Sequence, residues 1–175
     1  MKVRMRKTNK DDIDSIYNCH KECFQQGDHW YKTAIQQFVD NSLVIESIDE
    51  NKIIAVLLQG PISPCDLAEI NDFIPQSESG AIFKNNNLHL ETCTGITMLC
   101  VLPEYRGKGL AKKLIEQHFK ENQDEVLCLH TRKSNPAYNL YIKMGYEHIA
   151  SIKEKYYFPT EDSSFMIKKS PLSHV

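Results

Sequence analysis

Residues 101–111 read Val101-Leu-Pro-Glu-Tyr-Arg106-Gly107-Lys108-Gly109-Leu110-Ala111, and they join an apolar run to an amphipathic one. The apolar run over residues 88–102 predicts a strand, and residues 107–122 repeat apolar side chains at helical spacing. A helix that begins after a glycine-rich turn directs unpaired N–H groups and its positive dipole end at one point. The stretch therefore predicts an anion-binding loop, in which two glycines allow close approach and two basic side chains add charge.

This loop differs from two familiar phosphate motifs. The P-loop pattern GxxxxGK[ST] is absent, and no G-x-G-x-x-G occurs. Without a further motif, the alternative interpretation is a solvated turn that happens to be basic.

The rest of the chain predicts alternating strands and helices. Strands are expected over residues 3–6, 42–48, 52–59, 126–131, 146–158 and 163–169, and helices over residues 11–24, 30–39 and 136–144. Residues 60–87 are rich in proline and asparagine, which predicts a loop-rich insertion with at most a short helix at residues 66–73. The central strand–helix–strand order implies a parallel pair with a right-handed crossover. We expect a single α/β (α+β) domain over residues 1–175, with one mixed sheet and helices on both faces.

Composition excludes several classes of protein. Hydrophobic residues make up 41% and charged residues 25% of the 175-residue chain, as in an ordinary globular domain. The formal net charge of -2 argues against a nucleic-acid binder that works by bulk electrostatics. No apolar run reaches the roughly 18 residues of a membrane span, and the basic N-terminal stretch lacks the apolar core of a secretory signal. We therefore expect a cytoplasmic protein without a membrane span.

The six cysteines are expected to be reduced in that compartment. Cys100 and Cys128 lie in apolar, strand-like stretches and are predicted to be small core residues. Cys19, His20 and Cys23 resemble part of a metal cluster, but the sequence offers no second ligand pair at the usual spacing. We therefore expect no metal.

Two motifs resemble those of the GNAT superfamily of N-acetyltransferases. Arg106-Gly-Lys-Gly109-Leu-Ala111 fits the [Q/R]-x-x-G-x-[G/A] loop of this superfamily, and Asn135-Pro-Ala-Tyr-Asn-Leu-Tyr141-Ile-Lys-Met-Gly145-Tyr146 is similar to its LYxxxG[FY] helix. The resemblance implies the GNAT fold, a mostly antiparallel sheet of about seven strands whose fourth and fifth strands form a splayed parallel pair. It also implies acetyl-CoA as cosubstrate.

A narrower resemblance is to the catalytic subunits of protein N-terminal (Nα) acetyltransferases. Leu129-His130-Thr-Arg132-Lys133-Ser134-Asn135 is similar to the LHVRKSN stretch of that group, and residues 155–166 are similar to its KYYxxxEDAxxM hairpin. Asp28-His-Trp30-Tyr31 resembles a helix of its Golgi-type members. Three features depart from the group: Cys23-Phe24-Gln25-Gln26 replaces an LPE or FP motif, Gly95 stands where some members place a catalytic tyrosine, and the segment after Ser134 is one residue shorter.

The resemblance assigns a role to each candidate site residue. The pyrophosphate of the coenzyme is expected on Arg106, Gly107, Lys108, Gly109, Leu110 and Ala111, its thioester arm along Leu99, Cys100 and Val101, and further coenzyme contacts at Asn135 and Tyr138. Tyr141 is the candidate general acid for the leaving thiolate, and His130 or Glu91 the candidate base. Tyr31, Tyr156 and Tyr157 are expected to contact the acceptor. Without the resemblance, each would be an ordinary core, strand or surface residue.

Four functions remain open from the sequence. The first is acetylation of the N-terminal α-amine of a protein or peptide, with an auxiliary subunit as a possible partner. The second is acetylation of a small amine such as a polyamine, an arylalkylamine or an aminoglycoside. The third is acetylation of protein lysines. The fourth is a CoA-binding module without catalysis, against which the intact Arg106, Gly109 and Tyr141 argue.

Overall fold

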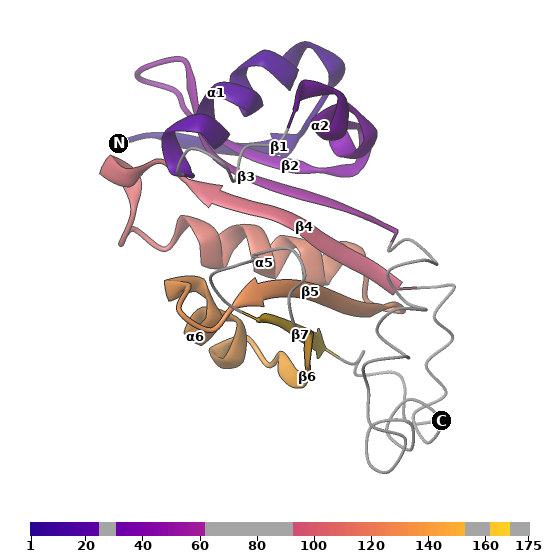
Figure 1. The fold of residues 1–175 in the computed structure, drawn as a ribbon. Coiled ribbons are helices and arrows are strands. Elements are labelled where there is room, and N and C mark those ends of the chain that lie inside the picture. Colours follow the sequence, from indigo (N-terminus) through magenta and orange to yellow (C-terminus); the bar gives the residue numbers. More distant parts are fainter. Residues whose placement is uncertain (25–30, 62–92, 153–161, 169–175) are drawn as a thin grey trace. The chain divides into compact units, whose positions relative to one another are not determined.

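The computed structural model describes residues 1–24, 31–61, 93–152 and 162–168 (Figure 1). The chain divides into two compact units: unit 1 comprises Met1–Gly60 and Ile96–Glu121, and unit 2 comprises Pro61–Gly95 and Asn122–Val175. Seven strands follow the order β1-β2-β3-β4-β5-β7-β6. Most of the expected insertion at residues 60–87, including the optional helix at 66–73, lies outside the described residues.

The strands of unit 1 are β1 (Val3–Lys7), β2 (Leu43–Ser47), β3 (Lys52–Pro61) and most of β4 (Cys93–Val101). β1 pairs with β2, and β2 with β3, in antiparallel register, with a bulge after Ile45 in the second pair. Almost every residue of β2 and β3 is buried. Continuous burial of this kind explains why residues 43–45 and 53–58 are apolar without interruption, since both faces of the sheet are covered.

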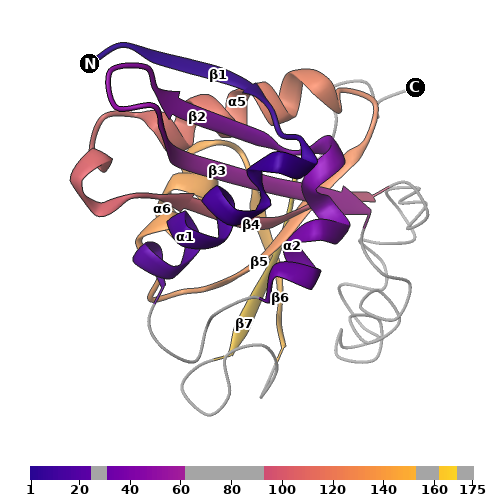
Figure 2. The same cartoon turned by 90° about the horizontal axis from the view of Figure 1, so that it is seen from above.

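Helices cover both faces of the strands of unit 1. On one face lie α1 (Ile13–Cys23) and α2 (Lys32–Phe38), and α5 (Leu110–Glu121) lies against the other (Figures 1 and 2). Short 3-10 turns lie between these helices and the neighbouring strands: η1 (Lys10–Asp12), η2 (Val39–Asn41) and η4 (Pro103–Tyr105). Asn9 caps η1, because its side chain accepts from the Asp11 amide at 2.8 Å and closes a capping box with Asp12.

Unit 2 contains β5 (Val126–Arg132), α6 (Pro136–Lys143), β6 (Glu147–Ile152) and β7 (Ser163–Lys168). β7 pairs antiparallel with both β5 and β6. The first residues of β4 also belong to this unit, where the Thr94 carbonyl accepts from the Cys128 thiol at 3.6 Å and the Thr94 hydroxyl bonds the Glu125 carboxylate. The beginnings of β4 and β5 therefore lie together, which makes the pair parallel as the sequence predicts.

The expected strands and helices are present where the structure describes them, with small differences at their ends, whereas residues 88–92 and 153–158 of two predicted strands lie outside the described residues. The helix predicted from residue 107 begins at Leu110, because Gly107 and Gly109 adopt positive φ angles that an α-helix does not use. The helix predicted over 11–24 begins as the turn η1 and continues as α1. The expected splay of the β4/β5 pair stays a prediction. Within the described ranges, no helix combines the length and apolarity that crossing a bilayer requires.

A buried hydrogen bond fixes α5 to β3 in unit 1. His118 is fully buried, and its Nδ1 donates to the amide oxygen of Gln59. Burial lowers the pKa of His118 to about 4, so the folded protein holds this imidazole neutral at pH values where an unfolded chain protonates it.

This predicts a loss of stability in mild acid. Between about pH 6.5 and pH 4 the unfolded chain binds a proton at His118 that the folded protein does not, so the free energy of unfolding falls as the pH drops through this window. Urea unfolding at pH 7.5 and pH 4.5 measures the loss, which we expect to be about 1–3 kcal/mol larger in the wild type than in His118→Asn.

The matched control is His148→Gln, which removes a less buried imidazole in unit 2. Its pH dependence should follow that of the wild type. An equal loss in the wild type and in His118→Asn would show that other groups cause the acid sensitivity.

Candidate functional site

The turn between β4 and α5 is the centre of the candidate site. Gly107 has a φ of 74° and Gly109 a φ of 75°, both in the left-handed region. A Cβ added to either glycine would meet no atom within 4 Å, so the turn borders open space. The amide of Lys113 bonds the Gly109 carbonyl at 3.1 Å, which begins the helical hydrogen bonding, while the amides before it have no partner within the helix. This geometry suits an anion, as the sequence predicts.

The basic side chains of the turn are held by neighbouring backbone. Arg106 Nε donates to the Val101 carbonyl at 3.1 Å, and Lys108 Nζ donates to the Glu104 carbonyl at 3.1 Å. Lys108 Nζ also lies 4.9 Å from the centre of the Tyr105 ring, a cation–π distance. Both side chains remain exposed, so their charges act at the surface of the turn.

The end of β4 leads directly into this turn. Cys100 is buried, whereas Leu99 and Val101 are half-buried on the alternate face. Leu102 follows and is fully buried, with its amide bonded to the Ile54 carbonyl at 3.0 Å. The predicted coenzyme residues 99–101 and 106–111 therefore form one continuous segment of unit 1, running from strand to helix.

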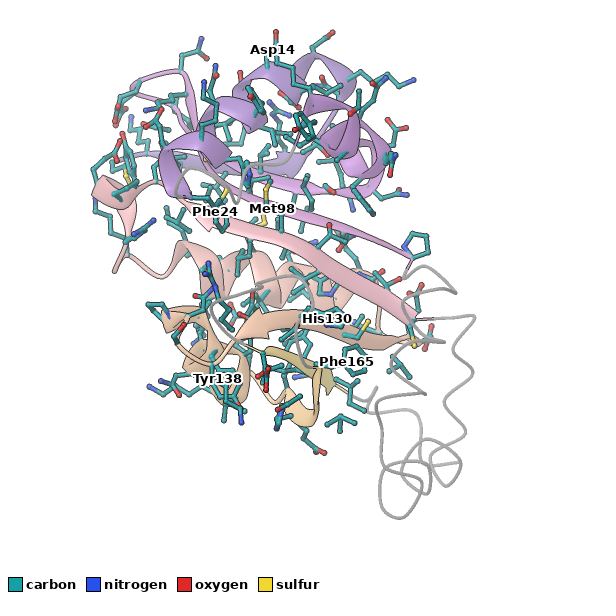
Figure 3. All side chains as sticks on the ribbon, viewed as in Figure 1. Asp14, Phe24, Met98, His130, Tyr138 and Phe165 are labelled. Carbon is teal, nitrogen blue, oxygen red and sulfur yellow. The ribbon has the colours of Figure 1, made fainter. Side chains whose placement is uncertain are left out.

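The second motif forms α6 in unit 2. Asn135 caps this helix, because its side-chain oxygen accepts from the Ala137 amide at 2.9 Å, and Gly145 ends the turn with a φ of 87°. Tyr141 is only 5% exposed, and its ring meets that of Tyr146 edge-on at 5.6 Å. Tyr138 lies on the same helix, half-buried beside His148 (Figure 3). The helical placement that the sequence gives Tyr141 is confirmed; its role as an acid stays a prediction.

His130 lies on β5 opposite Phe165 of β7 (Figure 3). The two rings are 4.9 Å apart, and His130 Nδ1 lies 3.3 Å from the Ser163 hydroxyl. These contacts orient a half-buried imidazole, as either a base or a structural residue would require. Tyr31, in unit 1, is 80% exposed at the start of α2. Glu91, Tyr156 and Tyr157 lie outside the described residues, so their roles stay predictions.

The sequence pattern groups Cys19 with Cys23 but does not connect them with Cys100. Cys100 of β4 joins Cys19 and Cys23 of α1, and the three sulfur atoms lie within 4.8 Å of one another. The signal for Cys19 and Cys23 was present in their helical i, i+4 spacing. The third sulfur comes from a residue 77 positions beyond Cys23, which no local pattern connects to the first two.

Comparison with known proteins supports this fold. Residues 73–148, which include the turn, His130, Asn135 and Tyr141, match the family model of the acetyltransferase (GNAT) domain. Comparison with curated protein sequences gives no match.

Solved structures show the same fold over nearly the whole chain. NAA60 of Arabidopsis thaliana in complex with acetyl-CoA has a TM-score of 0.72 and 21% identity, covering 95% of this chain and 98% of that one. The ribosomal-protein-S18-alanine N-acetyltransferase of Escherichia coli has a TM-score of 0.69 and 16% identity, covering 95% and 93%. A mosquito arylalkylamine N-acetyltransferase-like protein has a TM-score of 0.69 and 16% identity, covering 95% and 99%. The chain therefore has the GNAT fold, and its residues 73–148 match the model of the GNAT acetyltransferase domain.

The left-handed turn gives a prediction for stability. Gly109→Ala should lower the free energy of unfolding by about 1–2 kcal/mol, since an L-residue is strained at this φ although its Cβ meets no atom. Gly109→Asn should lose less, because asparagine tolerates the left-handed region better. Urea unfolding measures both. Equal stability of Gly109→Ala and the wild type would contradict the left-handed assignment.

Proposed function

We propose that this protein transfers the acetyl group of acetyl-CoA to the N-terminal α-amine of a protein or peptide. The observation that supports acetyl transfer is the turn at residues 106–109, where two left-handed glycines, each with open space where a Cβ would stand, directly precede the start of α5. A diphosphate needs several donors and room for close approach, and this turn supplies both. The residues present therefore fit the coenzyme.

The chain's own residues then have these proposed tasks. Backbone amides of residues 107–111 and the side chain of Arg106 bind the pyrophosphate, and residues 99–101 receive the thioester arm, as a strand accepts an added strand. Acetyl-CoA supplies the activated acetyl group. Tyr141 donates a proton to the departing thiolate from its phenol, and His130 accepts a proton from the amine, directly or through water. Asn135 and Tyr138 complete the coenzyme contacts.

The basicity of the acceptor supports an α-amine over a lysine. An α-amine titrates at about 7.7–8.0 and a lysine at about 10.4, so freeing a lysine amine at neutral pH costs about 3 kcal/mol more. A histidine, whose ordinary pKa is about 6.5, is a modest base. It suits an α-amine, which loses its proton more easily than a lysine amine does. The stretch 129–135, which places His130 on β5 and Asn135 at the start of α6, is also the one that resembles Nα-acetyltransferases.

Several structural neighbours support the same acceptor. They include the NatC complex bound to a Gag peptide and CoA, and Naa20 of Chaetomium thermophilum in complex with a bisubstrate analogue. Because NatC is a complex, the proposal includes an auxiliary subunit. The arylalkylamine-type neighbour makes a small amine the second candidate acceptor.

A peptide panel tests the acceptor. Pairs of peptides with the same sequence, each containing one internal lysine, are offered with a free or a blocked N-terminus, beside spermidine and serotonin. We expect mass spectrometry to find one acetyl group on the α-amine of the free peptides and none on their blocked partners. Acetylation of the lysine or of the small amines alone would replace the proposed acceptor but retain acetyl transfer.

Tyr141→Phe tests the general acid. The variant keeps the ring that packs against Tyr146 but lacks the proton donor, so kcat should fall about 100-fold or more while KM for acetyl-CoA changes little. Release of the coenzyme thiol measures both constants. Tyr17→Phe, on α1 and outside the assigned residues, is the control and should keep kcat within about twofold of the wild type. Full activity of Tyr141→Phe would remove Tyr141 from this role.

A further inference from the structure

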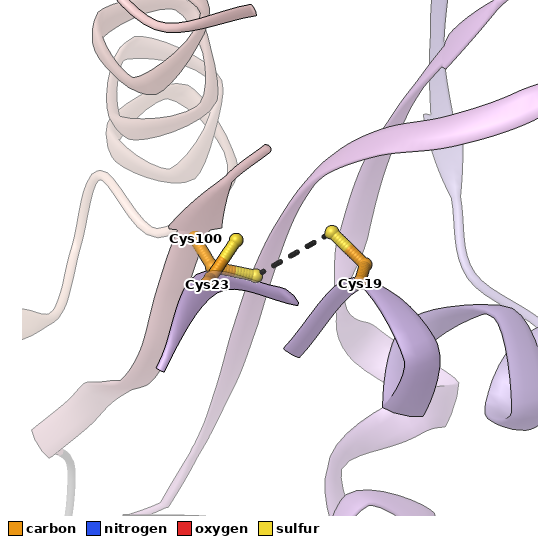
Figure 4. A group of neighbouring side chains, drawn as sticks. All are labelled: Cys19, Cys23 and Cys100. Carbon is orange, nitrogen blue, oxygen red and sulfur yellow. Dashed lines mark hydrogen bonds between the residues drawn. The ribbon is translucent and has the colours of Figure 1, made fainter. Parts of the chain in front are cut away.

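Three cysteine sulfurs meet between α1 and β4 in unit 1 (Figure 4). Cys19 and Cys23 are one helical turn apart on α1, and the Sγ of Cys19 lies 3.8 Å from the Sγ of Cys100 on β4. Cys19 and Cys100 are buried, whereas Cys23, the last residue of the helix, is half-buried. Cys23 is therefore the member of the cluster that a small solute can reach most easily.

The groups around the three cysteines favour the thiolate form of Cys23. The Cys100 and Cys19 thiols interact with the Cys23 sulfur, and together with the Arg106 guanidinium they hold the pKa of Cys23 well below its ordinary value. The Cys19 thiol, the Cys23 sulfur and burial raise the pKa of Cys100. Arg106 is kept in place by its bond to the Val101 carbonyl at 3.1 Å. The cluster thus pairs one accessible thiolate with two buried thiols, an arrangement typical of redox-sensitive cysteines.

We propose that Cys23 is a site of oxidative modification by peroxides, and that Cys100 resolves the oxidised sulfur as a disulfide joining α1 to β4. In the first step the Cys23 thiolate attacks the O–O bond of hydrogen peroxide. An S–O bond forms, the O–O bond breaks, and hydroxide leaves and is protonated to water. In the second step the Cys100 sulfur attacks Cys23, an S–S bond forms, and the S–O bond breaks. Water leaves, and it carries away the Cys100 proton. Two thiols and one peroxide give one disulfide and two waters.

Cys100 is a better disulfide partner for Cys23 than Cys19 is, for geometric reasons. Cys19 and Cys23 lie on consecutive turns of the same helix, so a bond between them would bend that helix around its own backbone. Cys100 approaches from a different element, and the sulfurs already lie within 4.8 Å of one another, so an S–S bond of about 2.05 Å requires an approach of less than about 3 Å.

The modification would regulate the proposed active site, and this consequence rests on the proposed function. Cys100 lies between Leu99 and Val101, the residues proposed to receive the thioester arm. The disulfide would also remove the negative charge opposite Arg106, at the beginning of the coenzyme turn. We therefore expect peroxide to inhibit acetyl transfer, and a dithiol reductant to restore it. The bond itself is measured by mass and needs no activity, so its failure is distinguishable from failure of the proposed function.

Disulfide mapping in a Cys93→Ser background tests the proposal. Trypsin separates Cys19 (residues 11–21) from Cys23 (residues 22–32), and Cys93→Ser leaves Cys100 as the sole cysteine of residues 85–106. After hydrogen peroxide treatment we expect peptide 22–32 joined to peptide 85–106, and no joined species in Cys23→Ser. A link from 11–21 to 22–32 or to 85–106, or no link at all, would overturn the assignment.

A labelling experiment on the wild type tests the proposal without relying on variants that fold correctly. In the untreated wild type, brief exposure to iodoacetamide at pH 6 should alkylate Cys23 at least tenfold faster than Cys93 and Cys128, which are buried cysteines of unit 2. Equal rates for the three would contradict a thiolate at Cys23.

The same labelling also separates oxidation from metal binding. In the protein treated with EDTA and then with one equivalent of Zn²⁺, we expect the labelling of Cys23 to be unchanged. Stoichiometric retention of zinc with protection of all three cluster cysteines would show a thiolate metal site instead and would overturn the proposal.

Discussion

The conformation of two glycines organises unit 1. An L-residue with a side chain pays about 1–2 kcal/mol to enter the left-handed region, and Gly107 and Gly109 both occupy it with no neighbouring atom above them. The chain turns there between the end of β4 and the start of α5, and open space lies where a Cβ of either glycine would stand. The proposed binding of a diphosphate depends on this turn.

Much of this arrangement could be predicted from local sequence patterns. Apolar runs located β2 and β3 because both strands are buried on both faces, and helical spacing located α1, α5 and α6. Asn9 and Gly145 are local signals of the same kind, because capping depends on neighbouring residues. The spacing of apolar side chains predicted a helix from residue 107, three residues before α5 begins at Leu110, because this spacing contains no information on the φ angle of a glycine.

What the sequence could not predict depends on contacts between distant segments. The convergence of Cys100 with Cys19 and Cys23 requires the packing of α1 on β4, and the burial of His118 requires Gln59 of β3 as its partner. The resemblance to known motifs assigned chemistry to Tyr141 and His130. The structure adds that each ring is oriented by a neighbour, Tyr146 in one case and Phe165 in the other. Such orientation is a tertiary property that periodicity does not encode.

The ends of α6 have a consequence for how a ligand would be received. A helix of eight residues is too short to persist by itself in water. Here the Asn135 side chain closes its first turn, and Lys168 Nζ of β7 donates to the Met144 carbonyl at 2.5 Å just beyond its last turn. The entropy of ordering Tyr141 is therefore lost once, during folding, and not again at each binding event. An acceptor or coenzyme that contacts this phenol would meet a group already immobilised, so that little of its binding free energy would be consumed in arranging the protein.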